Sequence, residues 1–279
     1  MAHPQIAVFA RLADGNQDRV RAIEGQATLL GRTMHGIAYN ATHDEIVVPQ
    51  QFGQAILTFA GGASGEAKPI RVLQGPKTQF VSPDRLAIDQ VKGEIYVPEG
   101  EKVLIFPRTA VGDSAPVRVL AGPDTRIGQA RAVAIDNARD LLVVLATPPG
   151  KRREYELLVF DRTAAGNAKP LRVISGLLAY GNIAISSSGM IFVVLPPRIG
   201  TDNAPTTRDI GYVGVWSVND NGRVPARYTV GGPNGVLIEP RGVTLDEKHR
   251  TVIVSDKQLN AVLTFHAPQL FATSTDVAR

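Results

Sequence analysis

The sequence predicts an all-β fold, a β-propeller built from four-stranded blades. First, one segment pattern recurs about every 50 residues, which is the length of one blade. Second, short β-branched runs alternate with turns rich in Gly, Pro, Asp and Asn, as in strands joined by tight connections. Third, no stretch of useful length shows the 3.6-residue apolar period of an amphipathic helix.

The outermost strand of each blade is predicted by a Gly-x-x-x-Pro-x-Arg-x-apolar-x-Gly segment at 65–75, 112–122 and 166–176. A looser copy runs from Gly15 to Gly25, and a shifted copy surrounds Arg227. Proline is tolerated near the start of an edge strand, where its missing N–H costs little. Because the arginine recurs, we expect it to serve the blade, facing solvent or clamping a neighbour.

The third strand precedes each of these segments as an apolar run that ends in an aromatic residue. Such runs occupy residues 6–9, 56–59, 103–106, 157–160 and 213–216. A sixth run, 262–265, has no copy of the outer segment after it.

The two inner strands lie between these parts. The first, which carries a small residue at its middle, is predicted at 36–39, 85–89, 132–136, 182–185 and 242–246. The second is predicted at 45–48, 94–97, 141–145, 190–195 and 251–255. Asp89, Asp136 and Asp246 end a first strand, and a recurring aspartate there is expected to cap a tight turn. Residues 186–189, Ser-Ser-Ser-Gly, read as the matching turn of another repeat.

We therefore predict one domain over residues 1–279, with five inner strand pairs and six third strands. Its repeats lie at about 1–30 (partial), 31–80, 81–127, 128–178, 179–235 and 236–279. Two arrangements remain open. In a five-bladed ring, the N-terminal outer strand completes the last blade. In a six-bladed ring, the first blade lacks its inner strands in this chain, and the open edge invites self-association.

Composition excludes several classes of function. The chain of 279 residues has no Cys, which excludes disulfides, Cys-ligated metals and Cys nucleophiles. No apolar run approaches the ~18 residues of a membrane span. A net charge of +4 does not by itself imply nucleic acid, and 6% aromatic residues make binding by base stacking unlikely. No phosphate-binding Gly loop occurs. The first residues do not read as a leader peptide, so we expect a cytoplasmic protein, or an extracellular or periplasmic one if a leader was removed.

These units resemble the NHL-repeat family, and more closely bacterial extracytoplasmic repeat proteins of the form P-x-G-I-A-x-D…I-Y-V…V-F…G-N/D-x-x-P-x-R-x-I-x-G. The resemblance covers nearly the whole chain. Six blades is the commoner number in that family, and the resemblance implies a secreted or surface protein. It implies little about chemistry, since this fold carries enzymes, binders and scaffolds.

Propeller ligands usually bind at the mouth of the channel, where the inner strands begin. The residues predicted there are His35, Asp84, Arg85, Arg131, Asn182 and Arg241. Arginine forks bind carboxylates and phosphates with two hydrogen bonds, so this set favours a small anionic ligand. The alternative is a ring of polar side chains that pair with one another around water.

Two long connections between second and third strands are expected on the same face. One, 147–155, carries Lys151, Arg152 and Arg153; the other, 196–212, carries Arg198 and Arg208. Long loops in compact folds are often functional, so we expect ligand or partner contacts from them. The alternative is a solvated loop without a role.

We expect no metal, no cofactor and no catalytic residue. Only His35 of the five histidines maps to the mouth, and Arg131 and Arg241 would repel a cation there. The expected function is a non-enzymatic binding or interaction module for an unknown protein or a small anion. Two alternatives stay open: a lactonase- or lyase-like hydrolytic enzyme that uses the same channel, and a structural or assembly protein.

Overall fold

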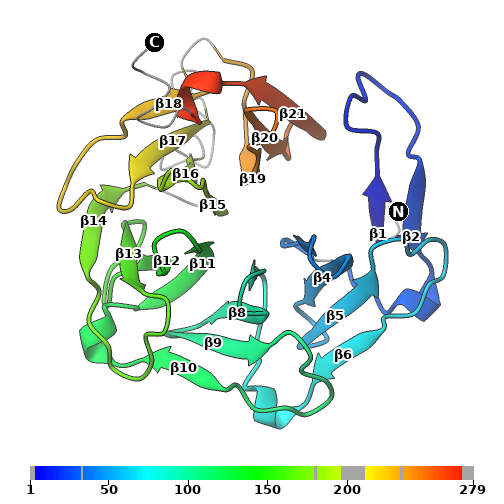
Figure 1. The fold of residues 1–279 in the computed structure, drawn as a ribbon, viewed down its shortest axis with the longest axis horizontal. Coiled ribbons are helices and arrows are strands. Elements are labelled where there is room, and N and C mark those ends of the chain that lie inside the picture. Colours follow the sequence, from blue (N-terminus) through cyan, green and yellow to red (C-terminus); the bar gives the residue numbers. More distant parts are fainter. Residues whose placement is uncertain (1–3, 33, 179–180, 196–210, 233–234, 272–279) are drawn as a thin grey trace. The chain divides into compact units, whose positions relative to one another are not determined.

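The computed structural model describes residues 4–32, 34–178, 181–195, 211–232 and 235–271. Almost all regular structure is antiparallel β-sheet, and the helical segments described are four single turns of 3₁₀ helix (Figure 1). These are η1 (Gln26–Thr28), η2 (Pro76–Thr78), η3 (Pro123–Thr125) and η4 (Pro268–Leu270). In this part of the chain, no helix has the length and apolar character needed to cross a membrane.

The strands form five consecutive meander sheets, the blades of a β-propeller, preceded by a hairpin. The hairpin is β1 (Gln5–Val8) and β2 (Arg21–Glu24). The first sheet has β3 (Ala38–Asn40), β4 (Glu45–Gln50), β5 (Ala55–Ala60) and β6 (Arg71–Gln74). The second has β7 (Ala87–Asp89), β8 (Glu94–Glu99), β9 (Lys102–Pro107) and β10 (Arg118–Ala121).

The third sheet has β11 (Gln129–Asp136), β12 (Leu141–Thr147), β13 (Tyr155–Asp161) and β14 (Arg172–Leu177). The fourth has β15 (Ile183–Ile185), β16 (Met190–Leu195), β17 (Tyr212–Ser217) and β18 (Tyr228–Val230). The fifth has three strands, β19 (Pro240–Asp246), β20 (Thr251–Asp256) and β21 (Ala261–His266). The predicted count of five inner pairs and six third strands is thereby confirmed.

The backbone contacts divide the chain into two compact units. The first comprises residues 1–99 and 104–119, and the second comprises 100–103 and 120–279. The first unit holds the hairpin, the first sheet and most of the second sheet. The second unit holds the third, fourth and fifth sheets.

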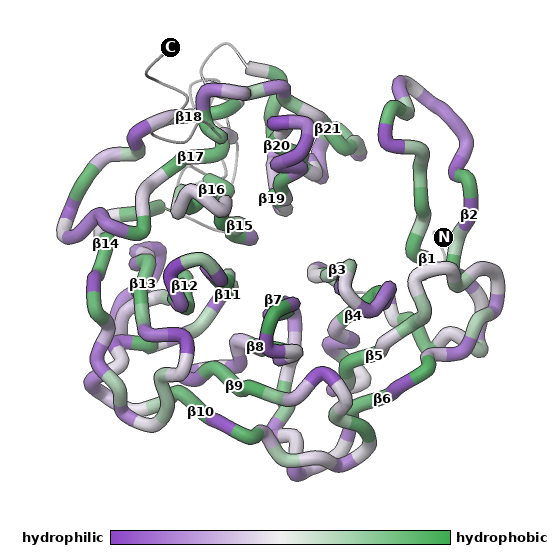
Figure 2. The backbone as a smooth tube through the Cα atoms, in the orientation of Figure 1, coloured by the Kyte–Doolittle hydropathy of each residue, from purple (hydrophilic) through white to green (hydrophobic). Residues whose placement is uncertain are grey.

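Apolar side chains pack between consecutive sheets. In the first compact unit, one cluster joins the hairpin to the first sheet through Ile23 and Phe59, which are fully buried. Another joins the first and second sheets around Val97 and Phe106. In the second compact unit, similar clusters join the third sheet to the fourth and the fourth to the fifth. The strands are predominantly apolar and many of their connections are polar (Figure 2). Within each compact unit, the sheets are therefore stabilised mainly by their neighbours in sequence.

A backbone latch links four outer strands, β2, β6, β10 and β14, to the next repeat. Isolated parallel bridges join Ile23 to Gly65, Leu73 to Gly112, Leu120 to Gly166 and Ile174 to Gly222. The glycines come from the connection between the third and fourth strands of the following sheet. Gly65, Gly112 and Gly166 have φ of 61°, 59° and 56°, a left-handed conformation in which a side chain would be strained. The glycine that opens each predicted outer segment is thus explained.

The hairpin occupies the place of third and fourth strands. Its β2 makes the same latch to Gly65 that β6 makes to Gly112. Among the described residues, β2 pairs only with β1, and β21 pairs only with β20. The described strands therefore form five blades and a two-stranded hairpin.

Candidate functional site

Three of the predicted mouth residues meet in the first compact unit. Asp84 lies between His35 and Arg85, because one carboxylate oxygen is hydrogen-bonded to His35 Nδ1 and the other accepts from Arg85 Nη1 at 2.9 Å. His35 and Asp84 precede the first strands of consecutive sheets. Gly36 permits their approach, since a Cβ atom there would lie 3.0 Å from the Asp84 carbonyl oxygen. His35 keeps about half of its side chain exposed (53%).

The other three lie in the second compact unit, at the starts of three first strands. Arg131 belongs to β11, Asn182 directly precedes β15, and Arg241 belongs to β19. Strand β15 contacts both β11 and β19, so it lies between the two strands that carry the arginines. The structure therefore groups these residues at one end of adjacent strands.

Arg131 and Arg241 each occupy a β-bulge. The register between β11 and β12 passes from Ala130–Ala146 to Ala132–Leu145, which leaves Arg131 as the extra residue. The register between β19 and β20 passes from Pro240–Asp256 to Gly242–Ser255, which leaves Arg241 as the extra residue. A bulge redirects a side chain away from the regular alternation of a strand. The two arginines thus share an uncommon backbone feature that the sequence pattern does not reveal.

The neighbours of Arg241 and Asn182 are polar. Arg241 Nη2 donates to the carboxylate of Glu239, and Lys257 Nζ lies 3.8 Å from that carboxylate. The Arg241 carbonyl accepts a hydrogen bond from Asn182 N at 3.1 Å. The side-chain oxygen of Asn182 accepts from Ile183 N at 3.0 Å, so this side chain turns to the start of its own strand.

The long loop of the third sheet begins beside Arg131. Gln129, two residues before Arg131, pairs with Thr147, after which the loop starts. Lys151 Nζ lies 3.8 Å from Glu154, and Arg152 and Arg153 are exposed. Arg198 and Arg208 of the second predicted loop lie outside the described residues.

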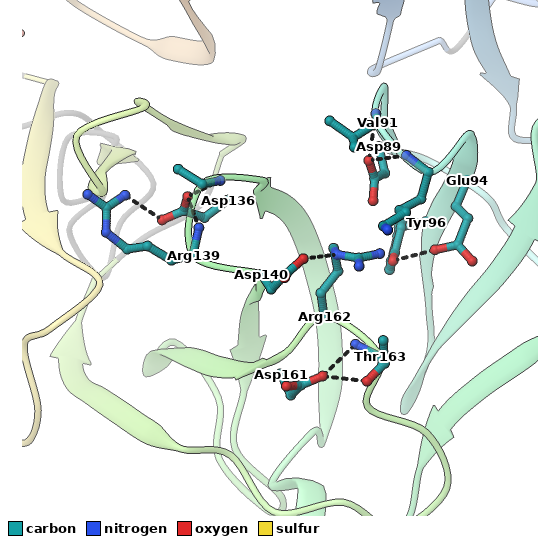
Figure 3. A network of polar contacts seen from close by, with 12 residues as sticks. Asp89, Val91, Glu94, Tyr96, Asp136, Arg139, Asp140, Asp161, Arg162 and Thr163 are labelled. Atoms are coloured by element: carbon teal, nitrogen blue, oxygen red, sulfur yellow. Dashed lines mark hydrogen bonds and ion pairs between the residues drawn. The ribbon is translucent and has the colours of Figure 1, made fainter.

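The aspartates that end the first strands make turns, as predicted. Asp89 Oδ1 accepts from the backbone of Val91 and Lys92, both at 2.9 Å. Asp136 Oδ1 accepts from Ala138 N and Arg139 N, and Asp246 does so from His249 N. Figure 3 shows Asp89 and Asp136 directed at these turns. In the fourth sheet, where Ser186 takes this place, its Oγ accepts from Met190 N at 3.1 Å in the corresponding turn.

The recurring arginines serve the blades, which also confirms the prediction. Arg118 makes two hydrogen bonds to Glu94, at 2.6 and 2.9 Å, within its own sheet. Arg172 Nε donates to the Val218 carbonyl of the next repeat at 2.6 Å, and Arg21 donates to carbonyls of residues 61 and 63. These side chains therefore clamp strands and neighbours together.

Buried charge is concentrated at Glu45, where β4 begins. Arg71 and Arg108 both lie 2.7 Å from its carboxylate, and Glu45 is 5% exposed. Burial acts to raise the pKa of Glu45, but the hydrogen bonds from the two arginines outweigh it and hold the pKa below its ordinary value. In the next sheet, burial and then the Glu94 carboxylate raise the pKa of Tyr96.

Sequence analysis missed a second recurring motif, Gly-x-x-Thr, which follows each outer strand in the first repeats. Thr28, Thr78 and Thr125 are fully buried, and each hydroxyl donates at 2.6 Å to the carbonyl of the glycine three residues earlier. Asp113 and Asn167, each next to a latch glycine, accept from Lys77 N and Asp124 N at 2.6 and 2.7 Å. The signal was the recurrence of Thr at a fixed distance from Gly.

Within the described ranges, no group of three or more His, Asp or Glu is placed to hold a metal ion.

The chain is similar in fold to known propeller structures. It matches a hydrazine synthase structure from Kuenenia stuttgartiensis with a TM-score of 0.55 and 12% identity, over 88% of this chain and 80% of that one. It matches a chain of a nidogen–laminin complex with a TM-score of 0.56 and 16% identity, over 96% and 92% of the two chains. No protein-family model and no curated protein matches the chain. At these identities the similarity shows the fold alone.

Proposed function

We propose that the protein is a binding module whose ligand carries a carboxylate, phosphate or similar anionic group. The observation that carries this proposal is the pair of bulge-borne arginines, Arg131 and Arg241, on the strands that flank β15. Bulges are over-represented next to functional sites because they re-aim a side chain. A single ligand that contacts both side chains would explain why a bulge carries an arginine on both strands.

The chemistry of the group fits an anion. A guanidinium donates in a planar fork that matches carboxylate and phosphate oxygens, and it stays charged at any physiological pH. Lys257 Nζ lies 3.8 Å from Glu239, the carboxylate that accepts from Arg241, so a second cation stands close to this arginine. Lys151, Arg152 and Arg153 would add positive potential from the loop that begins next to β11.

We further propose that the protein belongs with NHL-like interaction propellers that act outside the cytoplasm. The repeated units support the family, and the propeller fold supports an interaction role. One solved structure of similar fold comes from a nidogen–laminin complex, so a protein partner is a candidate beside a small anion.

The proposal is tested by calorimetric titration of the purified chain with inorganic phosphate, citrate and glucuronate at low salt. We expect binding of at least one of these anions that weakens as salt is added. Arg131→Ala and Arg241→Ala should each reduce the affinity about tenfold or more, because each removes a charge-assisted hydrogen bond.

Arg11→Ala is the matched control, since Arg11 is an exposed arginine of the hairpin connection. It should leave the affinity unchanged. Circular dichroism of each variant checks that the fold is retained. If none of the three anions binds, or if both mouth variants bind like the unaltered chain, the proposed anion site is wrong.

A further inference from the structure

Three large apolar side chains stand exposed at one end of the first compact unit. They are Leu29 (51% exposed), Phe52 (77%) and Val81 (69%), and together they are called the apolar patch here. Leu29 follows η1, Phe52 lies in the turn between β4 and β5, and Val81 follows η2. Leu29 and Val81 lie in connections from a fourth strand to the next first strand, and Phe52 lies in a connection from a second to a third strand. Connections of these two kinds are the ones predicted to share a face with the mouth residues.

Glutamine side chains bring the three segments together. Gln50 Nε2 lies 3.5 Å from the Leu29 carbonyl, on one side of the Phe52 turn. On the other side, Gln54 Nε2 donates to the Val81 carbonyl at 3.1 Å. Gln51 Nε2 also donates to Ser82 Oγ at 2.7 Å. Phe52 is therefore bracketed by the backbone segments of Leu29 and Val81.

Further hydrogen bonds fix the backbone segments that carry the apolar patch. Gln74 Nε2 donates to the Gly53 carbonyl at 2.7 Å, and Gln50 Oε1 accepts from Gly53 N. The carboxylate of Glu99, which is 6% exposed, accepts from Val81 N and Ser82 N at 3.1 Å. Surface side chains on such fixed backbone lose little further freedom when a partner binds.

The repeat itself does not require these residues. Leu29, Gln79 and Arg126 occupy the same place after η1, η2 and η3, with φ of 59°, 62° and 64°. The left-handed conformation costs a non-glycine residue about 1–2 kcal/mol, and Leu29 gains little burial to offset it. The other repeats carry Gln and Arg there. Val81 likewise corresponds to Gly31 and Gly128. An apolar choice at both places is explained by contact with something outside the chain.

We propose that the apolar patch binds an uncharged segment of a partner protein that presents a large aliphatic or aromatic side chain. A protruding aromatic residue on rigid backbone, rimmed by amide groups, has the composition of an interface hot spot. The amide rim can exchange hydrogen bonds with a partner backbone, and it offers no charge to attract an ionic segment. The inference goes beyond the proposed anion site, because the apolar patch belongs to the first compact unit and Arg131 and Arg241 belong to the second.

Charge and size argue for this partner over two others. Residues 26–32, 50–54 and 76–82 contain two charged residues, Arg32 and Lys77, whereas surfaces that bind anionic membranes carry clusters of 4–8 basic residues. Three side chains expose a few hundred Å², well below the roughly 800 Å² per partner of a stable dimer between copies. A short segment of another protein fits the area.

The test selects binders from a random peptide library displayed on phage, using the full chain as bait. Enriched peptides are then synthesised with a fluorophore and titrated by anisotropy. We expect the enriched peptides to share a large apolar residue and to lack net charge. Their affinity should fall at least about tenfold in Phe52→Gln and in Leu29→Gln. The latter variant installs the residue that the next repeat carries at this backbone position, so its fold should be unharmed.

Phe9→Gln is the matched control, because Phe9 is another exposed phenylalanine of the same compact unit (52%). It and Arg241→Ala should leave peptide affinity unchanged. Because Arg241→Ala should weaken anion binding, failure of one proposal is distinguishable from failure of the other.

Several results would overturn the assignment: no enrichment over a Phe52→Gln bait, or peptides that bind both baits equally. Acidic peptides lost in Arg241→Ala would assign partner binding to the arginines instead. Vesicles of phosphatidylcholine and phosphatidylserine that bind the chain through Phe52 would point to a membrane. A dimer in sedimentation analysis that Phe52→Gln abolishes would point to a second copy.

Discussion

At the scale of single residues, the charged side chains within the blades are mostly structural. Glu45 illustrates why, because a carboxylate that is 5% exposed would be unfavourable without the two guanidinium groups at 2.7 Å. Arg71 comes from the same sheet as Glu45, whereas Arg108 comes from the next one. The cluster therefore ties two consecutive sheets together as well as neutralising a buried charge.

This cluster predicts a specific dependence of stability on pH. The pKa of Glu45 is lower in the folded chain than its ordinary value of 4.5. A group with a depressed folded pKa stabilises the fold above its unfolded pKa, and this contribution is lost as pH falls through the folded value. In urea denaturation, Glu45→Gln should therefore be clearly less stable than the parent at neutral pH.

Below pH 4.5 the difference between parent and variant should shrink steadily. Glu101→Gln, at an exposed position, is the control and should track the parent at every pH. A difference that stays constant across the acid range would show that the Glu45 carboxylate does not titrate as argued.

What the sequence could predict at this scale follows from sequence distance. The aspartate turns were predictable because Asp89 and Asp136 bond to backbone groups two and three residues ahead. The bond between Glu45 and Arg108 joins residues 63 positions apart, and no local pattern reports it. The bulges at Arg131 and Arg241 were hidden for a related reason, since they depend on the register of a partner strand.

At the scale of elements, the latch explains how a four-residue outer strand stays attached. Strand β10 gains a parallel bridge from Leu120 to Gly166, and Asn167 Oδ1 accepts from Asp124 N in the turn that follows the strand. Asp113 does the same for the turn after β6. The repeated Gly-Asp/Asn segment therefore binds the outer strand and turn of the preceding repeat. The sequence pattern alone showed it only as the start of an outer segment.

The latch gives a prediction on stability. Asn167→Ala removes the acceptor for Asp124 N and should destabilise the fold by about 1 kcal/mol, measured by urea denaturation. Asn167→Asp keeps the acceptor that Asp113 already supplies elsewhere, so it should stay within a few tenths of a kcal/mol of the parent. Asn219→Ala, at an exposed turn position, is the control. Equal losses in Asn167→Ala and Asn167→Asp would contradict the assigned role.

At the scale of the whole molecule, the blades within each compact unit pack mainly against their neighbours in sequence. The fourth sheet shares one cluster with the third sheet and another with the fifth, and the two faces of β16 divide between them. Val193 points into the first of these clusters, and Phe192 points into the second. The fold class and the strand order were predictable because this organisation repeats the same local pattern. Four strands in a sheet were predicted as well, but whether the last sheet gains a fourth strand was left open, since it depends on which edges meet.

Neighbour packing predicts local effects of core substitutions. Val193→Ala, at a fully buried position, should cost about 2 kcal/mol and speed hydrogen exchange in β11–β18. Exchange in β20 and β21 should change less, because these strands pack on the other face of the fourth sheet. Mass spectrometry of exchanged peptides measures both, with the exposed Val236→Ala as control. Uniform acceleration through β11–β21 would indicate one cooperative block instead.

The latch also bears on how such a chain can grow. Each latch takes its outer strand from one repeat and its glycine from the next, so a repeat-length segment carries one half of two different latches. When a repeat is duplicated in tandem, the outer strand of one copy can form the same bridge to the glycine of the next copy. When a repeat is lost, the outer strand before it can form that bridge to the glycine of the repeat that follows. Gene duplication in whole repeats therefore needs no compensating substitution at the seams, and the number of blades is free to vary faster than the sequence within a blade.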